Sequence, residues 1–241
     1  VLILISDTGG GHRASAQALA SVIEQSHGHH VETTIVDVWT AYGPWPFNRM
    51  VRQYRYMQRR PALWYAMYKT SAFAPTRALL TSLQSWTARR GFAACIREHQ
   101  PDMVISMHPL CQTVPLLVLV AGGARPPLRK SAAASTAADG RLRSASAAVA
   151  ASPTDAAADA AEAHSRASDG TGTPPPLAYA ARLEAGGGTS RKPILFATVV
   201  TDLGAAHPLW FHPGADLVFV PTEQFGRSAR AAGLVPSQIR T

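Results

Sequence analysis

Short apolar runs and longer mixed stretches alternate along most of the chain. Each apolar run is eight residues or fewer with little polar interruption, which is typical of strands buried on both faces of a sheet. Such strands are expected at 1–5, 31–38, 102–106, 194–200 and 217–220, and the closing "SQIRT" begins another. The stretches between them predict helices at 12–26, about 48–72, 76–99 and 223–232. This alternation predicts an α/β fold, a Rossmann-like parallel sheet with helices on both faces.

Residues 122–192 depart from this alternation. The segment is rich in Ala, Ser, Gly and Pro, and Tyr179 is its one aromatic residue. Such a composition cannot bury enough apolar surface to offset the entropy of ordering, so a low-complexity, disordered insertion is expected. The folded domain is then formed by 1–121 joined to 193–241.

The composition argues against several classes of protein. The longest apolar run, "VPLLVLV" at 114–120, is far shorter than the ~18 residues of a spanning helix, so any membrane association is expected to be peripheral. Two cysteines without CxxC spacing indicate neither a disulfide framework nor a zinc site, and "HGHH" at 27–30 lies at a turn where a solvated role is expected. The chain opens on a strand without Met, so we expect a fragment in which no targeting segment is visible.

Positive charge is concentrated in one part of the chain. The formal net charge is +8, and the stretch between Asp37 and Glu98 has ten basic residues and no acidic one. Within it, residues 39–68 hold nine of the chain's eighteen aromatic side chains and five of those basic residues. Aromatic rings interleaved with arginines suit an anionic membrane surface, where rings lie at headgroup depth and guanidinium groups meet lipid phosphates.

This interfacial interpretation yields a specific set of expected lipid contacts. A second loop adds an apolar wedge, Trp210 with Phe211. Two alternatives stay open: the aromatics form an ordinary core under a solvated basic face, or the segment binds single-stranded nucleic acid. No RRM, KH or helix-turn-helix signature supports the latter, so nucleic acid is not expected as a partner. The expected lipid contacts are Trp45, Pro46, Phe47, Arg49, Arg52, Arg55 and Trp210.

The stretch "SDTGGGHRASA" joins the first strand to the first helix. A dinucleotide fingerprint needs its glycines spaced along the turn, a Walker loop needs GK[ST], and a nucleophile elbow needs G-x-S-x-G; the stretch has none of these. It is instead a glycine loop that presents backbone amides and sets a histidine at a helix N-terminus. Its residues of interest are Asp7, Gly9, Gly10, Gly11, His12 and Arg13.

His12 is a candidate general base. The positive end of the helix dipole disfavours imidazolium, so a neutral ring is expected, able to take a proton from a hydroxyl nucleophile. A carboxylate, Asp7 or Asp202, is expected to orient the ring. The alternative is that His12 caps the loop or hydrogen-bonds the backbone without a role in catalysis.

Polar residues also follow two later strands. In doubly wound sheets, ligands bind beyond the carboxyl ends of the strands. The motif "SMHPL" follows the third expected strand and "TDLGAAHPLWFHP" follows the fourth. The residues expected to gather around one cleft are therefore Asp7, His12, His108, Asp202 and His207.

Taken in order, the motifs resemble a known family. "LILISDTGGGHRASA", "VDVWTAYGPWPFN", "PDMVISMHPL", "VVTDLGAAHPLWFHPG" and "GLVPSQIR" resemble the N-terminal domain of plant and algal monogalactosyldiacylglycerol (MGDG) synthases. These are family-28-like glycosyltransferases, in the same group as the bacterial peptidoglycan lipid-intermediate enzymes. The resemblance covers 1–121 and 193–241, and the insertion at 122–192 has no counterpart in the usual family pattern.

The resemblance implies one half of a GT-B glycosyltransferase, an enzyme with two Rossmann-like domains facing across a cleft. The N-terminal domain takes diacylglycerol as the acceptor, and the C-terminal domain, absent from this chain, holds most of the UDP-galactose. The implied reaction is inverting transfer of galactose to the free hydroxyl of diacylglycerol, in galactolipid synthesis at the chloroplast envelope membrane. Helix N-termini and side chains stabilise the departing UDP, so no metal or cofactor is implied.

The resemblance also assigns roles to residues. His12 corresponds to the catalytic base, and the fragment alone is expected to be inactive. Two alternatives stay open: a peripheral lipid-binding module that does not catalyse, and a related transferase with another acceptor such as a sterol or a lipid-linked amino sugar. The loop residues expected where donor and acceptor meet are Gly9, Gly10, Gly11, Arg13, His108 and Asp202.

Overall fold

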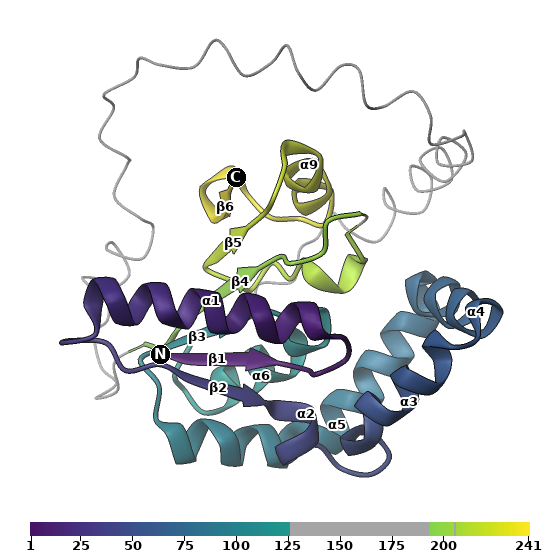
Figure 1. Ribbon diagram of the computed structural model, residues 1–241, viewed down its shortest axis with the longest axis horizontal. Coiled ribbons are helices and arrows are strands. Elements are labelled where there is room, and N and C mark those ends of the chain that lie inside the picture. Colours follow the sequence, from purple (N-terminus) through teal and green to yellow (C-terminus); the bar gives the residue numbers. More distant parts are fainter. Residues whose placement is uncertain (126–192, 205) are drawn as a thin grey trace. The chain divides into compact units, whose positions relative to one another are not determined.

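The computed structural model describes residues 1–125, 193–204 and 206–241 (Figure 1). The described residues contain a six-stranded sheet in the order β2-β1-β3-β4-β5-β6, with every neighbouring pair parallel. The predicted parallel α/β sheet is confirmed, including the strand that begins in the closing residues. The strands are β1 Leu2–Ile5, β2 Thr34–Asp37, β3 Met103–Ser106, β4 Leu195–Val199, β5 Leu217–Phe219 and β6 Ile239–Arg240.

Helices connect the strands, largely where the sequence predicts them. The single helix expected at about 48–72 is divided, because the chain leaves helical geometry at Arg60, ahead of Pro61. A proline ring disfavours the helical conformation of the residue before it and suits the first turn of a new helix. The helices are α1 Gly10–His27, α2 Val38–Tyr42, α3 Met50–Gln58, α4 Pro61–Ala72, α5 Ala74–His99, α6 Thr113–Ala121 and α9 Glu223–Ala231, and the 3-10 turns are η1 Phe47–Arg49, η2 Pro109–Cys111, η4 Pro208–Trp210 and η5 Pro236–Gln238.

Side chains of each strand alternate between two apolar cores, one on each face of the sheet. Ile3 and Ile5 pack with Ala16 of α1 on one face. Leu2 and Leu4 face the other way, into a larger core shared with α5, α6 and α9. Helices thus cover both faces, as the near-continuous apolar strands predict. Among the helices in the described ranges, none has both the length and the apolar character that crossing a membrane requires.

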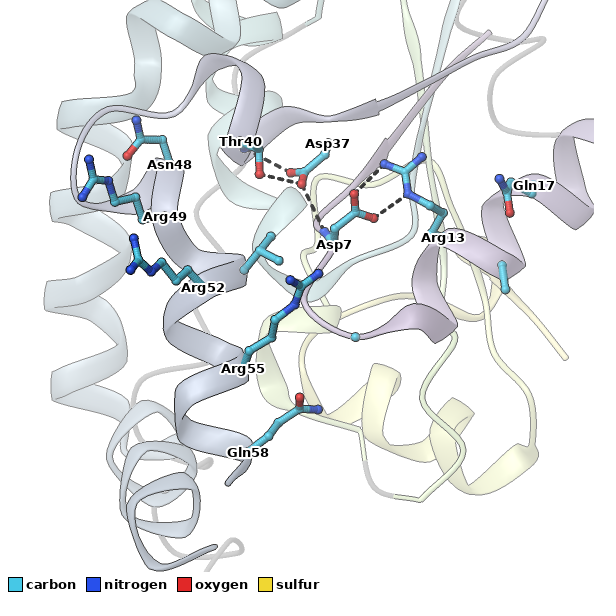
Figure 2. Close-up of a pocket in the computed structure, with 13 residues that line it drawn as sticks. Asp7, Arg13, Gln17, Asp37, Thr40, Asn48, Arg49, Arg52, Arg55 and Gln58 are labelled. Atoms are coloured by element: carbon cyan, nitrogen blue, oxygen red, sulfur yellow. Dashed lines mark hydrogen bonds and ion pairs between the residues drawn. The ribbon is translucent and has the colours of Figure 1, made fainter. Parts of the chain in front are cut away.

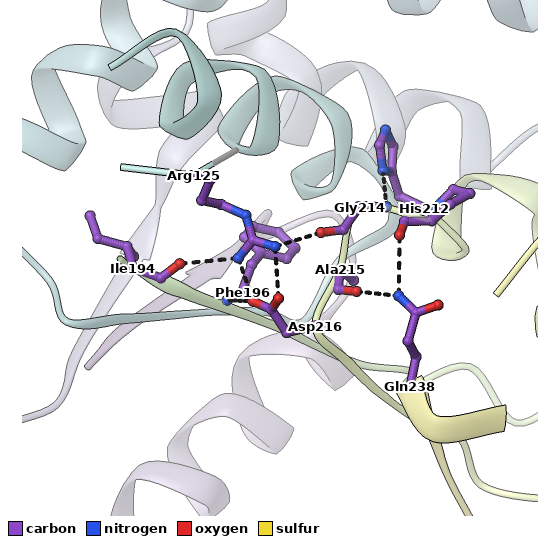
Figure 3. A network of polar contacts seen from close by, with 9 residues as sticks. Arg125, Ile194, Phe196, His212, Gly214, Ala215, Asp216 and Gln238 are labelled. Carbon is purple, nitrogen blue, oxygen red and sulfur yellow. Dashed lines mark hydrogen bonds and ion pairs between the residues drawn. The ribbon is translucent and has the colours of Figure 1, made fainter. Parts of the chain in front are cut away.

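A buried ion pair lies where the described chain stops at residue 125 and resumes at residue 193 (Figure 3). Arg125 donates to the backbone carbonyls of Ile194 (3.0 Å) and Gly214 (2.8 Å), and both of its terminal nitrogens bind the carboxylate of Asp216. The Asp216 carboxylate also accepts a hydrogen bond from the backbone N–H of Phe196, in β4. This cluster, the Arg125–Asp216 clasp, ties the chain on both sides of the gap to the loop before β5.

The clasp moves the boundary of the low-complexity segment. Composition places residues 122–125 in the insertion, yet Ala124 and Arg125 are buried in the folded domain. The expected disorder of the remainder concerns 126–192, which lie outside the described residues. The described residues all fall within one compact unit, Val1–Arg129 with Gly187–Thr241.

The strand order places a topological switch point between β1 and β3. The chain runs from β1 outward to β2 and then returns to β3 on the other side of β1. Loops leaving the carboxyl ends of β1, β3 and β4 therefore meet at one edge of the sheet. Figure 1 shows α3 and α4 on the side toward which β1 points.

Candidate active site

The glycine loop between β1 and α1 is held at Asp7. Both carboxylate oxygens of Asp7 accept hydrogen bonds from Arg13, at 2.7 and 2.6 Å, and the Asp7 backbone N–H donates to Asp37 (3.3 Å). Gly9 has a φ of +95°, which residues other than glycine rarely adopt. Because its carboxylate is engaged by Arg13, Asp7 does not orient His12, and that expectation is corrected.

His12 lies half-buried in the first turn of α1. Its Nδ1 is 2.7 Å from Oγ1 of Thr201, and its ring packs edge-on against His108, with 4.6 Å between the centroids. Burial lowers the pKa of His12 below 6.5, while the charge of Asp202 and the carbonyl of Met107 act in the opposite direction. The ring is therefore neutral at pH 7 and able to accept a proton, in agreement with its place at a helix N-terminus.

Asp202 is the carboxylate that acts on His12, and a buried indole holds it. The Nε1–H of Trp210 donates to Oδ2 of Asp202 at 2.6 Å, and the Trp210 ring lies 6.1 Å from that of His12. Trp210 has 0% of its surface exposed and Phe211 is also buried. The expected lipid wedge at Trp210 is therefore wrong, because the indole belongs to the core and its polar atom has a partner there.

His108 and His207 also reach the site, each bound to a hydroxyl. Nε2 of His108 lies 2.7 Å from Oγ1 of Thr8, in the glycine loop. Nε2 of His207 lies 3.2 Å from Oγ of Ser71, at the end of α4. Burial is the main cause that lowers the pKa of both imidazoles, so both are neutral at pH 7.

An apolar pocket of about 680 Å³ opens beside these histidines. His12, His108, Asp202 and His207 supply much of its polar lining, and α3, α4 and α5 supply most of the rest. A concave apolar site with a few convergent polar groups is typical of a ligand pocket. The apolar and aromatic lining includes Met50, Tyr54, Met57, Trp64, Met67, Tyr68 and Leu80.

A second, polar cavity of about 1010 Å³ also borders the glycine loop (Figure 2). Figure 2 shows Arg55 extending from α3 toward the pair formed by Asp7 and Arg13. Arg49 and Arg52 line the same cavity. Four arginines and two aspartates therefore surround it, which gives the cavity a net positive charge suited to an anionic group.

Large apolar side chains are exposed mainly along one segment, from Trp45 to Trp86. Of the thirteen large hydrophobic residues that are exposed in the described ranges, nine lie in this segment, and Trp45 itself is 73% exposed. The segment contains no acidic residue. Phe47 is different, because its ring packs against Trp39 with 5.7 Å between centroids and lines the apolar pocket.

Sequence reasoning missed the hydroxyls that contact the histidines. Thr8 and Thr201 lie inside the motifs that surround His12, but no local pattern pairs either one with a ring. Nothing in the sequence connects Ser71 to His207, 136 residues later. The "HGHH" motif is exposed, and the described part of the chain has no group of three or more side chains placed to hold a metal ion.

Comparison with known proteins identifies the family of the chain. A sequence profile of the family "Monogalactosyldiacylglycerol (MGDG) synthase" matches residues 12–128 and 188–241. Over its whole length the chain is 30% identical to a probable monogalactosyldiacylglycerol synthase, chloroplastic, of Nicotiana tabacum, of which it covers 32%, and to monogalactosyldiacylglycerol synthase 1, chloroplastic, of Arabidopsis thaliana, of which it covers 33%. The chain spans about a third of the length of these relatives. The fold, the glycine loop with its histidine and this match show that the chain belongs to the monogalactosyldiacylglycerol synthase family.

Proposed function

We propose that this chain is the acceptor-side part of an inverting glycosyltransferase that transfers galactose from UDP-galactose to diacylglycerol. One observation carries the proposal: a neutral histidine, His12, lies in the lining of a large apolar pocket at the switch point of the sheet. A base next to an apolar pocket suits a substrate that joins a reactive hydroxyl to hydrocarbon chains.

In this proposal His12 is the general base. The acceptor hydroxyl gives its proton to His12 while its oxygen forms a bond to the anomeric carbon of galactose. The bond from that carbon to the phosphate oxygen of UDP breaks, and the electron pair leaves with UDP. Attack from the face opposite UDP inverts the configuration. Asp202 stabilises the imidazolium that results, since its charge favours the protonated ring of His12.

The apolar pocket is proposed to hold the lipid part of diacylglycerol. Methionines are flexible side chains that adapt to irregular apolar ligands, and Met50, Met57 and Met67 all line the pocket. The rings of Tyr54 and Trp64 pack edge-on at 6.2 Å and give the same pocket a rigid wall.

Membrane contact is proposed for the exposed segment from Trp45 to Trp86, which is apolar and basic together. Trp45 and Pro46 lie on its exposed surface, while Arg49, Arg52 and Arg55 line the basic cavity and are proposed to meet lipid phosphates. The matched relatives are named chloroplastic, which supports the chloroplast envelope as the membrane concerned. Phe47 is reassigned to the wall of the apolar pocket.

The donor is proposed to bind mainly to a second, C-terminal domain, as in a GT-B enzyme. The glycine loop ends at Gly9, and Gly10 and Gly11 begin α1. All three glycines are proposed to lie where donor and acceptor then meet. We therefore propose that the chain alone binds the membrane and the acceptor but does not catalyse sugar transfer. No cofactor is invoked, because the base is a side chain of this chain.

Galactose transfer to diacylglycerol by the full-length protein tests the proposed base. His12→Ala is expected to lower kcat by about 10²–10⁴-fold, the usual contribution of general base catalysis. His30→Ala, at an exposed histidine in the turn that follows α1, is the matched control. Retention of near-normal activity by His12→Ala refutes the mechanism. A full-length protein that binds diacylglycerol vesicles but transfers no sugar supports the lipid-binding alternative instead.

Sedimentation with anionic vesicles tests the membrane surface separately. Replacing the cavity arginines together, as Arg49→Gln, Arg52→Gln and Arg55→Gln, is expected to weaken binding, most strongly at low salt. A control with the same loss of charge replaces Arg227, Arg230 and Arg240 by glutamine. Equal binding by the two variants contradicts a specific role for the cavity arginines.

A further inference from the structure

Three histidines of this chain share one local structure. Each is followed by proline, and in each the ring Nδ1 accepts a hydrogen bond from the backbone N–H two residues later. Proline has no N–H of its own, so this is the first backbone donor available after the histidine. The pairs are His108 with Leu110 (3.2 Å), His207 with Leu209 (3.2 Å) and His212 with Gly214 (3.0 Å).

This local structure fixes the tautomer. A backbone N–H can only donate, so Nδ1 of the ring carries no proton, and the proton of the neutral ring is on Nε2. Nε2–H of His207 then donates to the Ser71 hydroxyl, which itself donates to the carbonyl of Tyr68 (2.9 Å). By the same reasoning, Nε2–H of His108 donates to Oγ1 of Thr8 at 2.7 Å. Burial also lowers the pKa of both rings, which keeps them neutral.

We propose that His108 is a positioning residue: a fixed Nε2–H donor that holds Thr8, and through it the glycine loop, so that His12 is kept against the pocket. The role of His12 rests on the proposed function, whereas the bond between His108 and Thr8, here called the latch, rests on geometry alone.

The latch fixes the part of the glycine loop that Arg13 and Asp37 do not hold, which is the part after Asp7. Asp7 is fixed by Arg13 and Asp37, but the next residues are Thr8 and Gly9, the second with a φ of +95°. A glycine backbone is the most permissive one, so the loop can change direction at this point unless a side chain fixes it. Thr8 supplies that side chain, one residue before the turn into α1.

The other end of the latch is rigid. His108 is 5% exposed, and its carbonyl accepts hydrogen bonds from Oγ of Ser106 (3.2 Å) and Nε2 of Gln112 (3.4 Å). Gln112 also accepts from the Thr198 hydroxyl (2.8 Å), so β3, η2 and β4 are joined beneath the ring. Because the His108 ring is fixed relative to the sheet, its hydrogen bond also fixes the position of Thr8 relative to the sheet.

Neutrality of His108 also suits its neighbour. The rings of His12 and His108 lie 4.6 Å apart, and each would repel a positive charge on the other. A histidine locked as a neutral donor leaves His12 free to take up a proton during the reaction. The latch therefore positions the base without opposing its charge.

Four substitutions at the two ends of the latch test the proposal. In His108→Asn, the amide oxygen can replace Nδ1 as acceptor, but nothing reaches Thr8. In His108→Gln, the amide N–H reaches about as far as Nε2–H and can still donate to Thr8. Thr8→Val removes the acceptor, and Thr8→Ser keeps it. Thr8 is not buried, so its variants avoid the loss of folding that a change at His108 can cause.

The readout is ¹⁵N relaxation of the loop amides in the 241-residue chain. We expect backbone order parameters for residues 8–11 to fall from about 0.85 to below about 0.6 in His108→Asn and Thr8→Val, and to stay high in His108→Gln and Thr8→Ser. The double variant His108→Asn, Thr8→Val is expected to resemble either single one. His212→Asn, at the third His-Pro pair, is the control and leaves the loop ordered.

These measurements require no activity, so failure of the latch and failure of the proposed transferase give different results. In the full-length protein, His108→Asn is expected to lower kcat with KM unchanged, and His108→Gln to restore it. A loop that stays ordered in both His108→Asn and Thr8→Val overturns the proposal. Equal disorder in Thr8→Ser and Thr8→Val overturns it as well, because the hydroxyl is then irrelevant.

Discussion

The Arg125–Asp216 clasp offers the sharpest test of the fold around the gap at 126–192. The two side chains are only 6% and 14% exposed, so removing Asp216 leaves Arg125 as a buried charge without the carboxylate that binds it. In Asp216→Ala, Arg125 also keeps just its two backbone carbonyl acceptors, those of Ile194 and Gly214. Breaking a buried pair from one side costs about 3–5 kcal/mol, whereas replacing both members by apolar residues is often neutral. We therefore expect Asp216→Ala to be strongly destabilising and the double variant Arg125→Met, Asp216→Leu to recover most of the loss.

Thermal unfolding followed by circular dichroism measures this prediction. For a domain of this size, a loss of about 3–5 kcal/mol corresponds to a fall in Tm of roughly 6–20 °C. Glu223→Gln, which breaks the exposed ion pair between Glu223 and Arg230, is the control and is expected to change Tm little. The burial argument for the clasp is refuted if Asp216→Ala has the same Tm as the control variant. It is also refuted if the double variant has a lower Tm than Asp216→Ala.

Three further changes have defined outcomes. Burial, with Arg125 nearby, lowers the pKa of His212 from 6.5 to about 4, so between these values this ring binds a proton in the unfolded chain but not in the folded one. By urea denaturation, the fall in stability from pH 6.5 to pH 4 should therefore be about 3 kcal/mol smaller in His212→Asn than in the parent chain. Asp202→Asn removes the charge that raises the pKa of His12, and an NMR titration of the ring should therefore show a lower value than in the parent chain. In Gly91→Ala the new Cβ would lie 1.9 Å from the carbonyl oxygen of Tyr42, so α5 must shift away from α2, at a cost of about 1–3 kcal/mol by urea denaturation.

The sheet and the convergence of its loops could be predicted because they depend on local pattern. A strand buried on both faces requires a nearly continuous apolar run, and each run expected as a strand forms one, whereas the run at 114–120 lies in α6. In a parallel sheet the carboxyl ends share one edge, so the residues after three strands must meet. For this reason the sequence predicts one cleft with Asp7, His12, His108, Asp202 and His207. All but Asp7 line the apolar pocket, and Asp7 lines the polar cavity instead.

Side-chain pairing could not be predicted in the same way. Asp7 and Asp202 both follow strands, and only the fold shows that Arg13 engages the first while Trp210 holds the second. Composition marked Trp210 as an interfacial aromatic, although a tryptophan in a polar loop is equally suited to a buried site that satisfies its N–H. The break between α3 and α4 could have been predicted from Pro61, because proline favours the start of a helix over its interior. The single helix expected at about 48–72 follows the aromatic pattern and ignores this residue.

The three His-Pro pairs distinguish the proposed base, His12, from three other buried or half-buried histidines. A base needs a ring nitrogen whose lone pair can be offered to a substrate hydroxyl. In His108, His207 and His212, the lone pair of Nδ1 is held by the chain's own backbone, and Nε2 carries the proton. His12 is followed by Arg13 rather than proline, and its Nδ1 contacts a hydroxyl, that of Thr201, which can turn away by rotation about one bond. Among the histidines that follow β1, β3 and β4, the residue after each one therefore separates the fixed donors from the proposed base, His12.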